Sequence, residues 1–145
     1  MLYRIGKFLL LIYFTVFHRV KVTGRENIPK TGPVLIFANH PHYLDMMAIA
    51  VYFPRKIHYM AKMELFKNPV LGYILKKIGA FPVNRGKGDV GSVKTVFKLL
   101  KQSKVVGIFP EGTRTKMKDP KKRKAGAAML ALNSGVPVLP IGIES

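Results

Sequence analysis

Short apolar runs recur along the chain, each bounded by turn residues and separated from the next by a segment of helical length. Strands are expected at 20–22, 33–38, 57–61, 81–85, 105–109 and 136–143. Helices are expected at 44–52, 65–78, 89–103 and 125–133. The second of these is interrupted early by Asn68-Pro69, and Gly79 is its expected stop. Alternating strands and helices indicate an α/β fold, in which helices cover a mostly parallel sheet. The site of such a sheet lies outside the carboxyl ends of its strands.

The first twenty residues differ from this pattern. A mainly apolar run at 8–17 is flanked by Arg4, Lys7, Arg19 and Lys21. As a helix it would be about 15 Å long, half of a hydrocarbon core, so it should not span a bilayer by itself. A buried core helix is the alternative, but the flanking cations favour a helix that lies in a membrane interface. We therefore expect a membrane-associating helix at 1–20 and an α/β domain at 21–145.

Charge limits the partners of this chain. It carries 25 Lys and Arg against 7 Asp and Glu, a formal net charge of +18, while 48% of its residues are hydrophobic. This combination indicates a folded protein whose basic surface binds a polyanion: nucleic acid, an anionic membrane or a phosphorylated substrate. No nucleic-acid-binding motif is present, so nucleic acid is the weakest of these. The absence of cysteine excludes disulfides, thiolate metal sites and acyl-cysteine intermediates.

The segment 39–45 is the strongest candidate for chemistry. The strand at 33–38 brings His40 to its carboxyl end, and Asp45 falls in the first turn of the next helix. An aspartate can hold one imidazole nitrogen protonated, which leaves the other nitrogen able to take a proton from a hydroxyl. The alternative is that Asn39 or Asp45 simply caps the helix and His40 is an ordinary loop residue. The segment alone does not decide between these readings.

Two further candidates follow strand ends, and their convergence favours the catalytic reading. Arg85 ends one strand, and Glu111 to Arg114 follow another. Each arginine can present a planar fork to a phosphate. Glu111 could bind substrate hydroxyls or orient Arg114, or it could form a structural salt bridge. The basic run at 116–124 is expected to be an exposed, solvated loop. A metal site is not expected, because His40 and His42 would point in opposite directions in an extended segment.

Four blocks, in order, carry a resemblance to a known family. They are Asn39-His40-x4-Asp45, Phe81-x3-Arg85, Phe109-Pro-Glu-Gly-Thr-Arg114 and Val136-Pro-Val-x-Pro140. Together they resemble the glycerolipid acyltransferases, most closely those that act on 1-acylglycerol 3-phosphate. The chain departs from the usual pattern at His42 and Asn84. It also ends soon after the fourth block, where family members normally continue, so one edge of the sheet is expected to be uncovered.

The resemblance implies acyl transfer from acyl-CoA or acyl-carrier protein to the free hydroxyl of a 1-acylglycerol 3-phosphate, giving phosphatidic acid. It implies no cofactor beyond that co-substrate, and a location on the cytoplasmic face of the cell membrane. His40 would be the general base and Asp45 its partner. The glycerol phosphate would be held by Arg85, Glu111, Gly112, Thr113 and Arg114. Two alternatives stay open: a non-catalytic module that binds anionic membranes, and an acyltransferase for another lysophospholipid.

Overall fold

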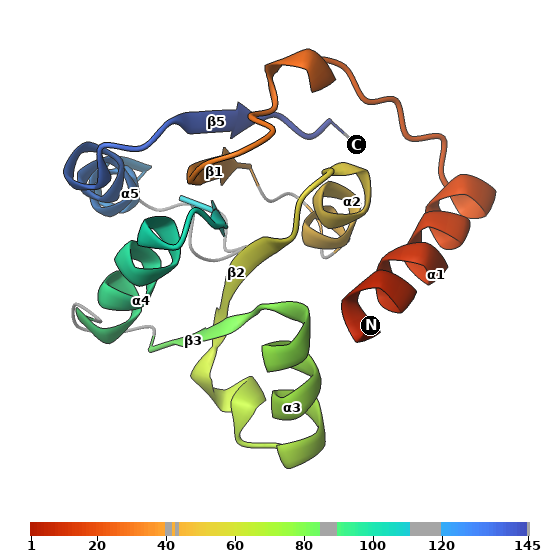
Figure 1. Cartoon of the computed structure of the whole chain (residues 1–145), viewed down its shortest axis with the longest axis horizontal. Helices are drawn as coiled ribbons and strands as arrows, with labels where there is room; N and C mark the ends of the chain where they lie inside the picture. The colour runs from red at the N-terminus through yellow and green to blue at the C-terminus, as the bar shows by residue number, and fades with distance from the viewer. Residues whose placement is uncertain (40–41, 43, 85–89, 111–119, 145) are drawn as a thin grey trace.

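Five parallel strands form the centre of the molecule (Figure 1). The computed structural model describes residues 1–39, 42, 44–84, 90–110 and 120–144, the side chains of 120–125 excepted. The strands are β1 (Val34–Ala38), β2 (Ile57–Lys62), β3 (Phe81–Val83), β4 (Val105–Ile108) and β5 (Val138–Ile141). Their order is β3-β2-β4-β1-β5, and every neighbouring pair is parallel. The predicted α/β fold is confirmed. Among the described strands, β3 and β5 are the two edges of the sheet.

Helices cover both faces of this sheet, because alternate residues of the strands are apolar on both sides. On one face α2 (Asp45–Tyr52) buries Ile49 against Val34 and Ile36 of β1. On the other face α4 (Val90–Lys101) buries Val96 against Leu35, and α5 (Pro120–Ser134) packs nearby through Leu130. In Figure 1, α4 and α5 lie to the left of the strands, and α2 lies to the right. The sheet therefore separates two distinct helical layers.

Two more helices lie outside these layers. The helix α1 (Leu2–Phe17) packs on α2 and touches α3 (Pro69–Ile78). Single 3₁₀ turns occur at Arg25–Asn27 and Met63–Phe66. The helix expected at 65–78 is interrupted where Asn68 precedes Pro69. The Asn68 side chain caps α3, because its Oδ1 accepts hydrogen bonds from the backbone N–H groups of Val70 and Leu71, each at 3.0 Å.

Two sequence predictions about elements are wrong. Residues 20–22 form no strand: they connect α1 to the 3₁₀ turn at Arg25–Asn27 and pair with none of the five strands, so their strand propensity has no partner to satisfy it. The helix expected at 125–133 begins at Pro120 instead, so residues 120–124, expected in a loop, are helical. Proline suits the first position of a helix, and lysine is a good helix former. Residues 116–119 of that expected loop lie outside the described part.

Candidate active site

All five strands are parallel, so their carboxyl ends lie at the same edge of the sheet. Register pairs Phe37 with Ile108 between β1 and β4, and Ala38 with Ile141 between β1 and β5. On the far side, Lys62 of β2 pairs with Val83 of β3. Three motif blocks run past the carboxyl ends of β1, β3 and β4, and the fourth, at 136–140, leads into β5 and forms part of it. This edge is the candidate site.

Asp45 is the predicted site residue that the structure describes. It is the first residue of α2, as expected, and only 5% of its surface is exposed. Its Oδ2 accepts a hydrogen bond from the backbone N–H of His42 at 2.5 Å, and its own N–H donates to the His42 carbonyl at 3.3 Å. These two bonds close the turn between β1 and α2. The helix dipole favours a carboxylate at this position.

The helix-cap alternative is not what the structure shows. The N-cap of α2 is Leu44, and no side chain caps that end of the helix. Asn39 also does not cap α2. Its Nδ2 donates to the carbonyl of Ile143 at 2.8 Å, and its Oδ1 accepts from the N–H of Ile143 at 2.7 Å. Asn39 therefore continues the pairing of β1 with β5 by a side chain, beside the residue predicted to be the base.

This role of Asn39 was missed by sequence reasoning. Its partner Ile143 lies 104 residues away, so no local pattern relates the two. The only available signal was that Asn39 follows the first buried strand and Ile143 follows the last. Parallel strands bring such positions to one edge, but strand order decides whether they are neighbours.

The remaining predicted site residues, His40, Arg85, Glu111, Gly112, Thr113 and Arg114, lie outside the described residues. The strands that lead to them are described, and their order sets the spacing. β4 is the direct neighbour of β1, whereas β3 is three places away, or roughly 14 Å at about 4.8 Å per strand. The block that contains Arg114 therefore starts much closer to the His40 segment than the block that contains Arg85.

The exit of β4 is anchored on the same face as Asp45. Phe109 packs against the core cluster that includes Ile49 of α2, and its ring stacks on Tyr59 at 5.8 Å between centroids. Burial raises the pKa of the Tyr59 phenol, so this ring stays neutral. The Phe109-Pro110 segment and the start of α2 are thereby held against one hydrophobic cluster. That packing fixes the two motif segments relative to each other.

The histidines are spread over the molecule. His42 is exposed beside the start of α2, and His58 is half-buried on β2, where its Nδ1 lies 2.9 Å from the carbonyl of Gly79. His18 lies at the end of α1 against Tyr13. Among the described residues, no group of three or more His, Cys, Asp or Glu is placed to hold a metal ion.

Comparisons with known proteins place these observations in a family. A family model described as "Acyltransferase" matches residues 19–144. The 1-acyl-sn-glycerol-3-phosphate acyltransferase of Bacillus subtilis is 44% identical over 126 residues, which is 86% of this chain and 62% of that protein. A protein of the same name from Borreliella burgdorferi is 33% identical, over 85% of this chain and 50% of that protein.

A solved structure matches as well. The crystal structure of the 1-acyl-sn-glycerophosphate (LPA) acyltransferase PlsC from Thermotoga maritima is similar with a TM-score of 0.76 and 29% identity. The match covers 95% of this chain and 56% of that one. The chain thus spans between half and two thirds of the length of these relatives.

Proposed function

Because the chain belongs to the acyltransferase family, we propose that it transfers a fatty acyl group from acyl-CoA or acyl-carrier protein to the free hydroxyl of a 1-acylglycerol 3-phosphate, giving phosphatidic acid. The observation that supports this proposal is the common edge: three motif blocks follow the carboxyl ends of parallel strands, and the buried Asp45 opens the helix beside β1. Residues 21–145 form the catalytic domain, and residues 1–20 form the membrane-associating helix.

His40 acts as the general base. It takes the proton from the acceptor hydroxyl as that oxygen attacks the thioester carbonyl, and the protonated imidazole then gives the proton to the departing thiolate. No covalent acyl-enzyme forms, so both substrates must be bound together. Asp45 holds the imidazole in one tautomer and stabilises its charged form. The hydrogen bond from the His42 N–H supports this role, because it fixes the orientation of the Asp45 carboxylate.

The glycerol phosphate is held by Arg85, Glu111, Gly112, Thr113 and Arg114. Strand order supports different roles in phosphate binding for Arg114 and Arg85. Arg114 follows the neighbour of β1 and holds the phosphate closest to the reacting hydroxyl. Arg85, which follows β3, reaches the ligand from the far side. Arg114→Ala should therefore raise the acceptor KM and lower kcat, since a misplaced acceptor presents its hydroxyl badly to the base.

The experiment that tests the reaction is consumption of thioester by the purified chain, run with acyl-CoA and acyl-carrier protein as donors and with several lysophospholipids as acceptors. His40→Ala should lower kcat roughly 10²–10⁴-fold, the range of general-base catalysis. His42→Ala is the matched control, because His42 is the neighbouring histidine that could be mistaken for the base. A larger loss in His42→Ala than in His40→Ala would overturn the assignment, as would an isolable acylated protein.

The second part of the proposal is association with the cytoplasmic face of a membrane, through α1. The side of α1 that faces the domain includes a lysine. Tyr3, Lys7, Leu10 and Phe14 face the domain, and Lys7 donates to the carbonyl of Phe53. Burial lowers the pKa of Lys7. The inward side of α1 is therefore mixed, with the apolar Leu10 and Phe14 beside a hydrogen-bonded lysine.

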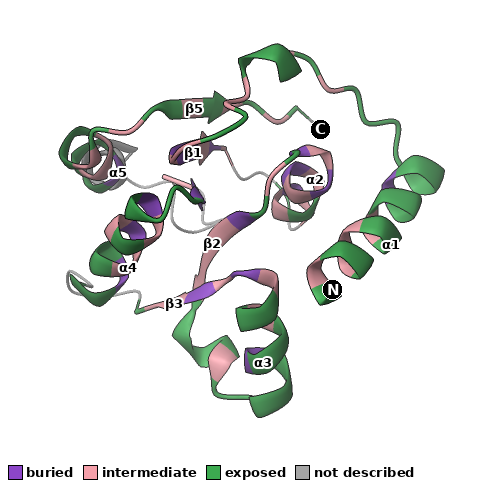
Figure 2. Ribbon diagram, in the orientation of Figure 1, coloured by how far each residue is buried: buried purple, intermediate pink, exposed green. Residues whose placement is uncertain are grey.

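The outer face of α1 is apolar instead. Phe8 is 61% exposed, Leu9 is 60% exposed and Val16 is 67% exposed, and Ile5 and Ile12 are exposed as well. Figure 2 shows the exposed side of α1 turned away from the rest of the molecule. No helix among the described residues is long and apolar enough to cross a membrane. An interfacial helix fits this geometry, with Arg4 and Arg19 near its ends as contacts for anionic headgroups.

A non-catalytic membrane-binding module is the alternative function that this outer face favours. It would bind anionic vesicles but consume no thioester with any acceptor. The thioester assay above separates the two directly, because turnover in the wild-type chain that is lost in His40→Ala excludes the module.

A further inference from the structure

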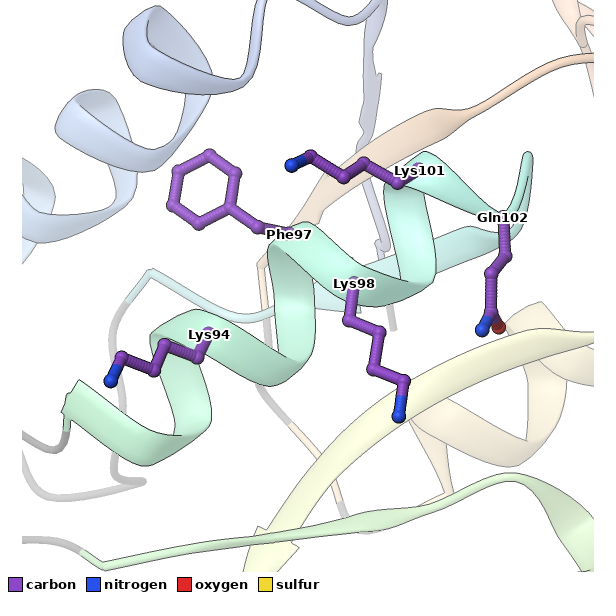
Figure 3. Close-up of a pocket in the computed structure, with 5 residues that line it drawn as sticks. All are labelled: Lys94, Phe97, Lys98, Lys101 and Gln102. Atoms are coloured by element: carbon purple, nitrogen blue, oxygen red, sulfur yellow. The ribbon is translucent and has the colours of Figure 1, made fainter.

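Three lysines form a stripe along the outer side of α4. Lys94, Lys98 and Lys101 are spaced at i, i+4 and i+7, which places them on one helix face over about 10 Å of axis. All three are exposed. With Phe97 and Gln102 they line an open hollow of about 500 Å³ (Figure 3). We refer to these five residues as the lysine groove.

The charge of the lysine groove is not balanced by the described part of the protein. No acidic residue occurs in α4, and within the described residues the side chains of the three lysines make no ion pair and no hydrogen bond. Other cations are used differently: Arg55 donates to three backbone carbonyls, and Lys56 donates to the carbonyl of Lys77. Like charges spaced four residues apart destabilise a helix. A bound anionic partner would relieve that repulsion.

The position of α4 shows on which side this partner approaches. Val96 and Leu100 of α4 pack on one face of the sheet, whereas α2, on which α1 lies, packs on the opposite face. A membrane held against the outer side of α1 would therefore lie across the sheet from the lysine groove. An anionic partner of the lysine groove would therefore approach from solution and not from that membrane.

We infer that the lysine groove is a docking site for an acidic helix of the soluble protein that carries the acyl donor as its thioester. This inference rests on the proposed acyl transfer. A protein helix fits the groove because the lysines are spread along one line and could pair with acidic residues at matching spacing. Phe97, half-buried at one side of the stripe, offers an apolar contact (Figure 3). Exposed charges of one sign also steer such a partner into place.

The groove lies within reach of the candidate site. α4 begins at Val90, a few residues after β3 leaves the carboxyl edge, and it ends before β4 begins at the opposite edge. Lys94 is therefore the groove lysine nearest the site. A carrier docked on α4 could extend its thioester arm over the start of the helix to that edge.

The test combines binding and kinetics in the whole chain. The probe for binding is a fluorescently labelled, unacylated acyl-carrier protein, titrated at low and high salt. The variant is Lys94→Gln, Lys98→Gln and Lys101→Gln together. We expect the dissociation constant to rise about tenfold or more, with the difference shrinking at high salt. In kinetics, the KM for acyl-carrier protein should rise by a similar factor, while kcat and the KM for acyl-CoA change less than about twofold.

A matched control carries the same charge change elsewhere. Lys30→Gln, Lys67→Gln and Lys76→Gln replace three exposed lysines that lie outside the lysine groove. This control should leave carrier binding within about twofold of the wild type. Phe97→Ala provides a separate test of the apolar contact and should weaken carrier binding while leaving its salt dependence unchanged.

The outcomes distinguish this inference from the proposed function. Equal increases in KM for both donors would overturn it, because the groove would then bind the phosphates of CoA. Loss of vesicle binding without loss of carrier binding would overturn it too, since the groove would then face the membrane. Equal weakening in the control variant would leave only a nonspecific charge effect and reject the docking site. If the wild-type chain binds the carrier but consumes no thioester, the proposed reaction fails and the docking site stands.

Discussion

The helices α1 and α4 lie on opposite sides of one sheet and present opposite chemistry to their surroundings. α4 follows the usual rule, with Val96 and Leu100 buried and three lysines outside. α1 is apolar on both sides: Phe14 is buried against the domain near Lys7, and large apolar side chains are also exposed on the outer face. The proposals above assign each helix a different medium, a membrane for α1 and the solution for α4. A reaction that joins a lipid acceptor to a soluble donor needs such a division, and the candidate site lies at the edge of the sheet between the two layers.

The largest effect is expected at Asp45, which should affect the chemical step but not binding at the outer surface of α1 or of α4. Asp45→Asn keeps the size of the side chain but removes its charge, so kcat should fall roughly 10²–10⁴-fold while carrier and vesicle binding persist. Steady-state kinetics and the two binding assays measure this. Combining Asp45→Asn with His40→Ala should cost scarcely more than His40→Ala, because paired groups act as a unit. Additive losses would separate Asp45 from the base.

The next effect is on the outer face of α1. Replacing Phe8, Leu9 and Ile12 together by Gln should weaken partition onto anionic vesicles about 10²-fold, from roughly 1 kcal/mol of apolar burial lost per residue. Vesicle sedimentation measures the partition. The α/β domain should stay folded, since these side chains are exposed.

A matched control for that variant is available on α3, where Val70, Tyr73 and Ile74 are also exposed. Replacing these three by Gln tests whether any exposed apolar surface serves equally well. An equal loss of vesicle binding in both variants would show that α1 has no special role, and the contrast between α1 and α4 would then be one of composition only.

A smaller effect is expected at Asn39, which ties the exit of β1 to the segment after β5. Asn39→Ala removes both hydrogen bonds to Ile143, so kcat should fall about tenfold with little change in either KM, as for a residue that positions the base. Asn39→Asp keeps the acceptor for the Ile143 N–H and should retain more activity. A drop in stability with unchanged kcat would make Asn39 purely structural.

The smallest effect concerns pH and a residue remote from both outer surfaces. Burial lowers the pKa of His58, and the nearby cations Lys56 and Lys104 lower it further, against a hydrogen bond to Gly79 that raises it. The unfolded chain therefore takes up this proton first. The free energy of unfolding should decrease as the pH falls below about 6.5, by less than about 1 kcal/mol because the ring is half exposed.

Urea unfolding at pH 7.5 and 5.5 measures this slope. His58→Gln keeps a hydrogen-bond donor for Gly79 but does not titrate, so this part of the pH dependence should disappear. A slope that is identical in the variant would assign the pH dependence to other groups.

Much of the fold could be predicted because the signals are local. The strands near 33–38, 57–61 and 105–109 were recognised from apolar runs bounded by turn residues, and β1, β2 and β4 agree with them within a residue or two. Gly79 was recognised as a helix stop, and its φ of 98° is one that other residues rarely adopt. The error at 20–22 has the same origin: Val20 and Val22 have strand propensity, but a strand also needs a partner.

The sequence by itself determined the fold class, the helix that starts at Asp45, and which segments reach the carboxyl edge, because periodicity and turn residues act over a few positions. Tertiary structure alone decided that β4 and β5 flank β1, that Asn39 pairs with Ile143, and that Lys7 faces inward while Phe8 faces out. Those outcomes depend on how two apolar faces of one sheet are covered at the same time. That packing joins residues a hundred positions apart, and no local pattern encodes it.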